Sequence, residues 1–269
     1  MTDVEASSGV RVEEVHFHSL RAAGCPEAEP PLLAGTFFVP TPASSDPAGQ
    51  TRFPGLVVGH GAGSNRHRHA SFCQIACTVG MTVLSIDFRG HGESTGLVDG
   101  PLEADVVAAA AVLRRHPSVH GGPIGYRGSS MGGFYGLRAA PEAAFAALCL
   151  LCPASEAVLL RGLTSFDEDT LAARGLSLRA DIEALRAWLE ASDSLAVAAR
   201  VSDPVLLVHA RGDDVVPLDH SLALAAALAG PVETMILPGG GHGTAQASPE
   251  LHRRTSEWLV GRLREARRE

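Results

Sequence analysis

The stretch Gly-Ser-Ser-Met-Gly-Gly at positions 128–133 constrains the fold of this chain more than any other. It follows an apolar, strand-like run at 123–126 and precedes a helix-like run at 134–140. Glycines lie two residues before and two residues after Ser130, so the stretch fits the pattern Gly-x-Ser-x-Gly. Small residues are needed where a chain turns sharply from a strand into a helix, because the backbones crowd together there. The stretch therefore predicts a turn that presents a serine hydroxyl above a sheet.

Ser130 is the candidate nucleophile of this turn. Ser129 does not meet the same requirement, because its neighbours at two residues' distance are Arg127 and Met131, and neither leaves the turn any room. The pattern alone is a weak signal, since Gly and Ser are common and many matches are ordinary turns. The rest of the chain has to decide whether this match is a nucleophile turn or an ordinary one.

Strand-like and helix-like segments alternate along most of the chain. Two strand-like runs at 10–19 and 32–39 come first, and a loop rich in Pro, Ser and Gly follows at 40–54. The later strand-like runs are short and apolar, as in strands buried on both faces, and lie at 55–59, 81–88, 123–128, 145–152, 204–209 and 232–237. The helix-like segments between and after them lie at 70–80, 101–116, 134–140, 217–228 and 249–264. This alternation predicts a mainly parallel sheet with helices on both faces.

The alternation pauses between residues 154 and 200. Here Thr164 and Asp167 fit a capping box, Gly175 can end the helix that this box would begin, and a second apolar stripe with helical spacing runs through 178–189. We interpret the segment as a small helical cap above the sheet. The alternative is that these helices simply connect strands of the sheet.

Length and composition favour one soluble α/β domain spanning residues 1–269. No apolar run approaches the roughly 20 residues that a membrane helix needs. The formal charge is −8, and no basic stretch alternates with aromatic residues as a nucleic-acid groove would require. The acidic start of the sequence is not followed by the apolar segment of a secretory signal. We therefore expect a cytoplasmic protein with no membrane or nucleic-acid partner, and the sequence leaves homo-oligomer formation open.

The chain has five cysteines, an odd number that is typical of a reducing compartment rather than of a disulfide framework. Cys73 and Cys77 lie four residues apart in a predicted helix, and Cys149 and Cys152 lie in a predicted buried strand. A zinc site of four thiolates would need turns that fold around the metal. We therefore interpret these four cysteines as small buried hydrophobic residues.

Ser130 can act as a nucleophile only if a base takes its proton, and that base needs an acceptor to fix its tautomer. Both are expected downstream, in loops where strands end. His242 lies in the glycine-rich run 239–243, directly after the strand predicted at 232–237, and the glycines would let its ring tip back over the sheet. It is the best candidate of the 12 histidines, and a role in capping a turn is the alternative.

The acid that would orient this histidine has two candidates. The strand predicted at 204–209 is followed by Asp213 and Asp214, and only one carboxylate can orient the base. Asp213 lies four residues before Pro217 and fits the spacing Asp-x-x-Val-Pro. We therefore assign the acid to Asp213 and interpret Asp214 as a turn or helix-start residue.

The order Ser130, Asp213, His242, with each residue after a predicted strand, is the order of the α/β-hydrolases and not that of chymotrypsin or subtilisin. From about residue 32 to the last helix, the chain resembles serine hydrolases of the α/β-hydrolase fold, especially the branch of esterases and serine aminopeptidases. The resemblance rests on five motifs in the family's order, at 60–63, 87–94, 128–133, 212–217 and 240–242. These motifs specify the fold and the triad far better than the substrate.

The resemblance implies an esterase-like reaction that needs no cofactor and no metal. Ser130 would attack the carbonyl of a small-molecule acyl substrate, His242 would carry the proton, and Asp213 would orient His242. The backbone N–H groups of Met131 and Ala62 would bind the oxyanion, with Gly61 as the alternative to Ala62. A thioester, small amide or peptide could replace the carboxylic ester. A non-catalytic binding protein of the same fold is the remaining alternative.

Three further features have more than one interpretation. The run Ser-Asn-Arg-His-Arg-His at 64–69 could attract an acidic or phosphate-bearing substrate or, less readily, a metal ion. Short charge runs are usually surface features, so we interpret it as a solvated loop and helix start. We interpret His91 as a turn residue rather than a ligand. Trp188 and Phe166 are candidates for a substrate pocket or lid, although such residues are more often core.

Overall fold

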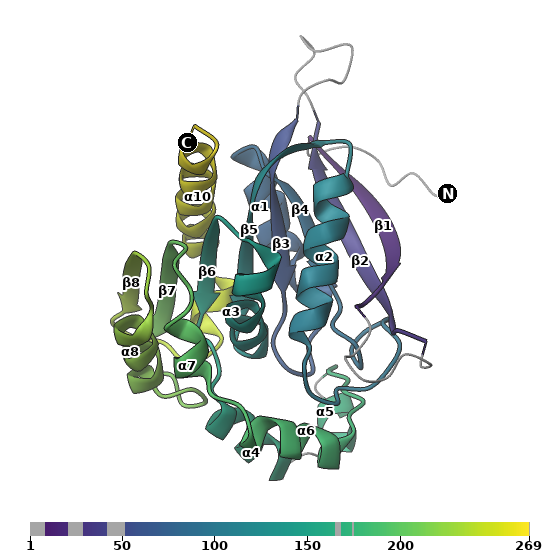
Figure 1. The fold of residues 1–269 in the computed structure, drawn as a ribbon, viewed down its shortest axis with the longest axis vertical. Coiled ribbons are helices and arrows are strands. Elements are labelled where there is room, and N and C mark those ends of the chain that lie inside the picture. Colours follow the sequence, from purple (N-terminus) through teal and green to yellow (C-terminus); the bar gives the residue numbers. More distant parts are fainter. Residues whose placement is uncertain (1–8, 21–28, 42–51, 165–167, 174, 269) are drawn as a thin grey trace.

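In the computed structural model of the protein, a sheet of eight strands lies between two layers of helices (Figure 1). The structure describes residues 9–20, 29–41, 52–164, 168–173 and 175–268. The strands are β1 (Val10–His18), β2 (Leu32–Pro40), β3 (Phe53–Gly59), β4 (Thr82–Ile86), β5 (Val119–Ser129), β6 (Ala147–Leu151), β7 (Val205–Ala210) and β8 (Val232–Leu237). The helices are η1 (Arg66–His69, a 3₁₀ helix), α1 (Ala70–Thr78), α2 (Glu103–Arg115), α3 (Met131–Ala143), α4 (Glu156–Thr164), α5 (Glu168–Ala173), α6 (Ile182–Glu190), α7 (Ser194–Ala198), α8 (Leu218–Ala227), α9 (Thr244–Ala247) and α10 (Pro249–Ala266).

The strand order across the sheet is β1-β2-β4-β3-β5-β6-β7-β8. β2 pairs antiparallel with both β1 and β4, and all the other pairings of this sheet are parallel. The prediction of a mainly parallel sheet between two helical layers is therefore confirmed. Because neighbouring parallel strands end at the same edge, the segments that follow β5, β6, β7 and β8 are brought together there.

The central strands are mostly apolar because each of their faces carries a core cluster. In β3, Val57 packs in the cluster that includes side chains of α2 and α3, whereas Leu56 and Val58 pack in the cluster that includes side chains of α1 and α10. All three side chains are fully buried. A strand of this kind shows a continuous apolar run in the sequence rather than an alternating one.

Helices α4, α5 and α6 belong to the segment between β6 and β7 and lie across one end of the sheet, at the bottom of Figure 1. α6 begins after Asp181, whose carboxylate accepts the N–H of Ala184 at 3.0 Å, and carries the expected apolar stripe. Gly175, with φ of +65°, follows α5 as predicted. No helix in the described part of the chain is long and apolar enough to cross a membrane.

The predicted capping box at Thr164 is wrong. Thr164 is the last residue of α4, and its hydroxyl donates a hydrogen bond to the carbonyl of Arg161 at 2.7 Å. A residue that continues one helix in this way cannot provide the extended N-cap conformation of the next helix. Asp167, the other residue of the predicted box, lies outside the described residues.

Candidate active site

Ser130 is the single residue between the end of β5 and the start of α3. Its backbone has φ of 51° and ψ of −117°, a conformation that non-glycine residues rarely adopt. Three hydrogen bonds hold it there: the Ser130 N–H donates to Leu151 at 2.9 Å, and its carbonyl accepts the N–H groups of Phe134 and Ala154, each at 3.0 Å. Strain of this kind persists only where the surroundings over-determine it, and it is common at active sites.

The glycines of the turn are required by close backbone packing. A Cβ atom on Gly132 would lie 2.5 Å from the carbonyl oxygen of Gly59, and one on Gly128 would lie 2.4 Å from the carbonyl oxygen of Gly132. The hydroxyl of Tyr126, on the strand below, donates a hydrogen bond to that same Gly132 carbonyl at 2.6 Å. The spacing Gly-x-Ser-x-Gly therefore reflects contacts with β3 and β5 that leave no room for a side chain.

Ser129 differs from Ser130 in its position in the chain and in its burial. It is the last residue of β5, is fully buried, and its hydroxyl has no hydrogen-bond partner among the described residues. Ser130 is only partly buried. The structure therefore places Ser130, and not Ser129, at the turn that the sequence predicts.

Asp213 and His242 meet at the same edge of the sheet, in the loops after β7 and β8. The Asp213 side chain is fully buried, and its Oδ2 lies 2.7 Å from His242 Nδ1. Its Oδ1 accepts the backbone N–H groups of Val215 at 2.9 Å and Val216 at 2.8 Å. Burial favours the neutral acid, but the hydrogen bonds from His242 and the two N–H groups outweigh it and lower the pKa of Asp213. The carboxylate is thus fixed in position and ionised.

His242 is oriented by this contact. Because Nδ1 faces the carboxylate, Nε2 is the nitrogen that can exchange a proton with another group. The His242 side chain is 17% exposed, whereas that of Asp213 is 0% exposed. Asp214 is an exposed neighbour, and the contact to the histidine is made by Asp213 as the sequence spacing favours. The catalytic roles of the three residues stay predictions.

The loop at 60–63 lies beside the serine turn. A Cβ atom on Gly61 would lie 3.4 Å from Ser130 Cβ. His60 anchors this loop: its Nε2 accepts the Phe88 N–H at 3.2 Å, so its Nδ1 carries the proton that is donated to the Gly61 carbonyl at 2.8 Å. Burial lowers the pKa of His60 to about 4, and the ring is therefore neutral near pH 7. The predicted oxyanion donors, Met131 N–H and Ala62 N–H, stay predictions.

A model of the prolyl oligopeptidase family matches residues 67–266. This chain belongs to that family. An uncharacterized protein of Mycobacterium tuberculosis is 31% identical over 221 residues, which cover 81% of this chain and 69% of that protein. The human alpha/beta hydrolase domain-containing protein 17B is 23% identical over 210 residues, or 77% of this chain and 67% of that protein. The crystal structure of acetyl xylan esterase 1 from Thermoanaerobacterium sp. matches with a TM-score of 0.70 at 18% identity, over 97% of this chain and 86% of that chain. The resemblance to α/β-hydrolases is confirmed.

In this α/β-hydrolase, the basic run at 64–69 is a helix start as predicted, since η1 covers Arg66–His69, but it is only partly solvated. Arg66 is 2% exposed and His69 is 6% exposed, although His67 and Arg68 do lie at the surface. The guanidinium of Arg66 forms an ion pair with Asp87, whose carboxylate is fully buried after β4. A buried carboxylate needs a cation close by, and Arg66 provides it.

The pair between Arg66 and Asp87 belongs to a larger network. Arg66 also donates to Thr36 at 3.0 Å, to Glu93 at 2.8 Å and to Glu14 at 3.1 Å. Its guanidinium is therefore engaged in holding the loops together and is not available to an acidic substrate. His91 is a turn residue as predicted, and it is fully buried with Nδ1 3.1 Å from the Arg89 carbonyl.

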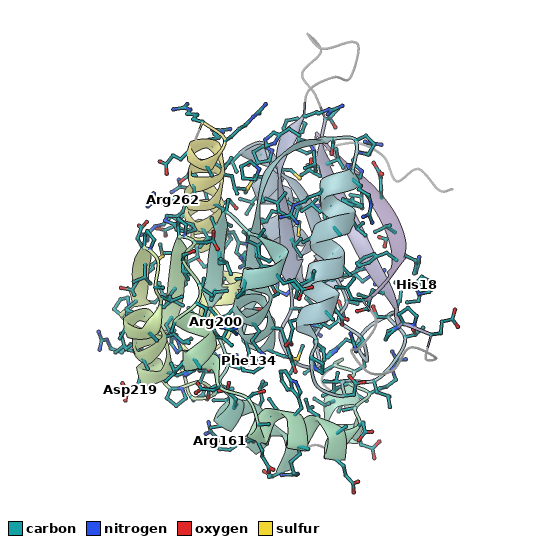
Figure 2. The ribbon with its side chains drawn as sticks, in the orientation of Figure 1. His18, Phe134, Arg161, Arg200, Asp219 and Arg262 are labelled. Carbon is teal, nitrogen blue, oxygen red and sulfur yellow. The ribbon has the colours of Figure 1, made fainter. Side chains whose placement is uncertain are left out.

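Trp188 joins the segment 154–200 to the body of the hydrolase. Its ring stacks on Tyr135 at a centroid distance of 5.7 Å and meets Phe134 edge-on at 6.1 Å, both on α3. The guanidinium of Arg138 lies over the same ring at 4.6 Å. In Figure 2, Phe134 lies at the level where the body meets this segment, in which Arg161 is labelled. Phe166 lies outside the described residues.

Backbone hydrogen bonds also tie this segment to the loops of the site. The Ser177 N–H donates to the Gly63 carbonyl at 2.9 Å, directly beside the 60–63 loop. Arg179 donates its N–H to Gly90 at 2.8 Å and accepts that of Val98 at 2.9 Å. These contacts were not predictable from the sequence, because each joins residues far apart in the chain without a pattern of its own.

The cysteine interpretation is confirmed for four residues, since Cys73, Cys77, Cys149 and Cys152 are buried and free. Cys25 lies outside the described residues. Cys152 has an additional property that the sequence reasoning missed: its sulfur lies within 4.8 Å of ligand atoms of both Asp213 and His242. The signal was present, because Cys152 directly follows a parallel strand, as the other two residues follow theirs at a short distance.

Proposed function

We propose that this α/β-hydrolase cleaves a carboxylic ester through an acyl-enzyme intermediate on Ser130. The observation that carries the proposal is the pair of Asp213 and His242, 2.7 Å apart, at the sheet edge where the strained Ser130 turn also lies. Ser130, His242 and Asp213 come from the ends of β5, β8 and β7, which are parallel members of one sheet. The likeness of the fold to acetyl xylan esterase 1 favours an ester among the acyl substrates.

The proposed reaction begins when Ser130 Oγ attacks the ester carbonyl and His242 Nε2 takes the hydroxyl proton. The backbone N–H groups of Met131 and Ala62 stabilise the oxyanion that forms. Collapse of this intermediate breaks the C–O bond, and His242 gives its proton to the departing alcohol. A water molecule that His242 deprotonates then attacks the acyl-enzyme and releases the acid. The ionised Asp213 stabilises the imidazolium in both steps.

The segment 154–200 is proposed to be the cap that shapes the acyl pocket. Its Ser177 contacts the 60–63 loop through Gly63, and its Trp188 packs on the helix that begins after Ser130. A substrate carbonyl bound between Ser130 and that loop would therefore have this segment close by. The acyl chain attached to that carbonyl would extend toward this segment and contact its side chains.

A peptide or amide substrate is the second candidate, and the family supplies the observation that favours it, since prolyl oligopeptidases give the matching model its name. The same triad would serve, because an amide differs from an ester in the leaving group that His242 must protonate. A thioester is a third variant of the same chemistry. All three predict that Ser130 becomes acylated.

One experiment separates these substrates. The wild-type protein is tested against aryl esters of increasing acyl length, acyl-CoA thioesters and aminoacyl amides, and a phosphonate that labels active serines is located by mass spectrometry. We expect ester turnover and a label on Ser130, with both lost in Ser130→Ala. Ser129→Ala is the matched control, because this buried neighbour should leave labelling intact. If the wild type and Ser130→Ala are equally inert and Ser130 is not labelled, the protein is a non-catalytic member of its family.

A further inference from the structure

Cys152 has an unusual backbone conformation next to the proposed active site. It directly follows β6 and has φ of 44°, and among the described non-glycine residues only Ser130 and Ala144 share a positive φ. Its N–H donates to the Val208 carbonyl on β7 at 2.8 Å, which holds the residue in place. Such strain in a non-glycine residue is found where the surrounding structure requires one particular arrangement. Here the arrangement brings a thiol to the acid and the base.

The thiol, the acid and the base form a compact group. Cys152 Sγ, a carboxylate oxygen of Asp213 and a ring nitrogen of His242 lie within 4.8 Å of one another. Sulfur, imidazole nitrogen and carboxylate oxygen are the three donor types that bind Zn²⁺ in proteins, and three protein ligands leave a fourth position for solvent. The His242 side chain is 17% exposed, so an ion from solvent can reach the group on the side of this residue.

We propose that Cys152, Asp213 and His242 form an inhibitory binding site for a soft divalent cation of the Zn²⁺ type. The proposal rests on the proposed function, because inhibition follows from the role of His242 as the base. A cation bound to either ring nitrogen stops His242 from acting as a base. At Nε2 it occupies the lone pair that would accept the Ser130 proton. At Nδ1 it displaces the N–H that faces Asp213, so that the proton of the neutral ring lies on Nε2, which then cannot accept one from Ser130. Turnover then stops until the ion leaves.

Without a bound cation, the sulfur of Cys152 stays protonated. Burial is the main cause that raises the pKa of Cys152 to about 12. A hydrogen bond with Ala210 opposes it, and the neighbouring Asp213 carboxylate raises the pKa further. When a divalent cation binds, the S–H bond breaks, the proton passes to solvent and the thiolate becomes a ligand. The positive charge of the ion offsets the cost of a buried thiolate beside the carboxylate, a cost that otherwise keeps the sulfur protonated.

The loop that carries His242 has room to adjust around an ion. Gly239 and Gly243 lie at the surface, and a Cβ atom added to either would meet nothing within 4 Å. Donor atoms up to 4.8 Å apart must come closer to bind at zinc distances of about 2.0–2.3 Å. A glycine-rich loop makes this movement easy for the histidine, while Asp213 and Cys152 stay fixed by the strands that precede them.

A spectroscopic titration tests the site without any substrate. Co²⁺, which replaces Zn²⁺ and shows a thiolate-to-metal charge-transfer band, is added to the chelator-treated full-length protein. We expect the band to saturate at about one ion per chain and to be absent in Cys152→Ser and in Cys152→Ala. Cys149→Ser is the matched control, because this residue is equally buried in β6, the strand that Cys152 follows, and should leave the band intact. A band that is missing in the wild type, or unchanged by both Cys152 variants, overturns the proposal.

Inhibition by Zn²⁺ provides the functional readout. We expect Zn²⁺ to block phosphonate labelling of Ser130, a chelator to restore it, and Cys152→Ser to need at least about tenfold more Zn²⁺ for the same block. Equal inhibition of both proteins would mean that the ion acts through His242 alone, which overturns the role of Cys152. If the band forms but no substrate is turned over, the proposed function fails and the metal site stands. If esters are hydrolysed and no band forms, only the metal site fails.

Discussion

The serine turn at 128–133 and the helical segment at 154–200 contribute to the same edge of the sheet, yet they are held in very different ways. Every residue of the turn except Ser130 is buried, and backbone atoms lie so close that its first two glycines admit no Cβ atom. In the helical segment, the described residues of α4 include no buried side chain, and α6 buries only Leu185 and Leu189. The geometry of the proposed chemistry is thus fixed by the body. In the segment 154–200, α4 and α6 are less deeply buried than the turn, and α7 is the helix that buries most of its residues.

Buried ion pairs extend this contrast to the loops around the turn. Arg66 pairs with Asp87, and Arg89 pairs with Asp105 at 2.7 Å, with both carboxylates fully buried. Removing one partner of such a pair leaves an unpaired buried charge, which is strongly destabilising. The loops at 60–69 and 87–94 are therefore held by charge as well as by backbone contacts, and the helical segment has no equivalent among its described residues.

The largest effect is expected at the acid. Asp213→Asn removes the charge that fixes the His242 tautomer and should lower kcat on the order of 10⁴-fold. Asp214→Asn, one residue further on and exposed, should stay within about twofold of wild type. Steady-state kinetics on an ester that the wild type hydrolyses measure both. A larger loss at Asp214 would overturn the choice of Asp213.

A pair of glycine substitutions tests the difference in packing directly. Gly132→Ala would place a Cβ atom 2.5 Å from a backbone oxygen, and should lower the free energy of unfolding by about 4 kcal/mol or prevent folding. Gly162→Ala, in α4, meets nothing within 4 Å and should raise it by about 0.5–1 kcal/mol, since alanine favours a helix. Urea unfolding gives both values. Similar losses in the two variants would mean that the helical segment is as tightly constrained as the turn.

Acid should loosen the loops of the turn before the helical segment. Burial lowers the pKa of His60 to about 4 and that of His91 to about 3, whereas unfolded histidine titrates near 6.5. Below pH 6.5 the unfolded chain therefore binds protons that the folded chain does not, so stability is full above that pH and falls as the pH drops. The loss by pH 4 amounts to about 3 kcal/mol for each ring.

Unfolding free energies measured from pH 7 to pH 4 check this expectation. His91→Phe should show a shallower decline, and His67→Phe, at an exposed position, should decline as the wild type does. Hydrogen exchange followed by mass spectrometry should show protection falling first around 60–63 and 88–91. Earlier loss of protection in α6 would reverse the order of the comparison.

The smallest effect is expected where the helical segment meets the body. Trp188→Ala removes the contacts with Tyr135 and Phe134, and should cost about 2 kcal/mol, less than a fully buried tryptophan. Because the turn itself is untouched, KM should rise while kcat changes little. Trp258→Ala is a useful control, since this second tryptophan lies on α10, away from α3, and binds Glu233 at 2.7 Å. A large fall in kcat at Trp188 would show that the segment helps to hold the turn.

Much of the fold was predictable from the sequence, because its signals are local. A continuous apolar run such as that of β3 marks a strand with core on both faces, and the run at 232–237 is β8 to the residue. The glycine spacing around Ser130 indicated that backbone segments approach closely at this turn. The capping box at Thr164 was a wrong prediction because Thr164 is equally able to end one helix or begin another, and the preceding helix decided which.

In the candidate site too, the features with local signals in the sequence were predictable and the contacts between distant residues were not. The serine turn, the succession of strands along the chain and the placement of Asp213 and His242 after later strands were readable from the amino-acid pattern, because each depends on residues a few positions apart. The burial of Arg66 against Asp87 and the position of Cys152 beside the acid and the base became visible only in the folded chain. These contacts join residues that follow different strands of the sheet. Their free energy depends on which charged groups and sulfur atoms the sheet brings together away from water.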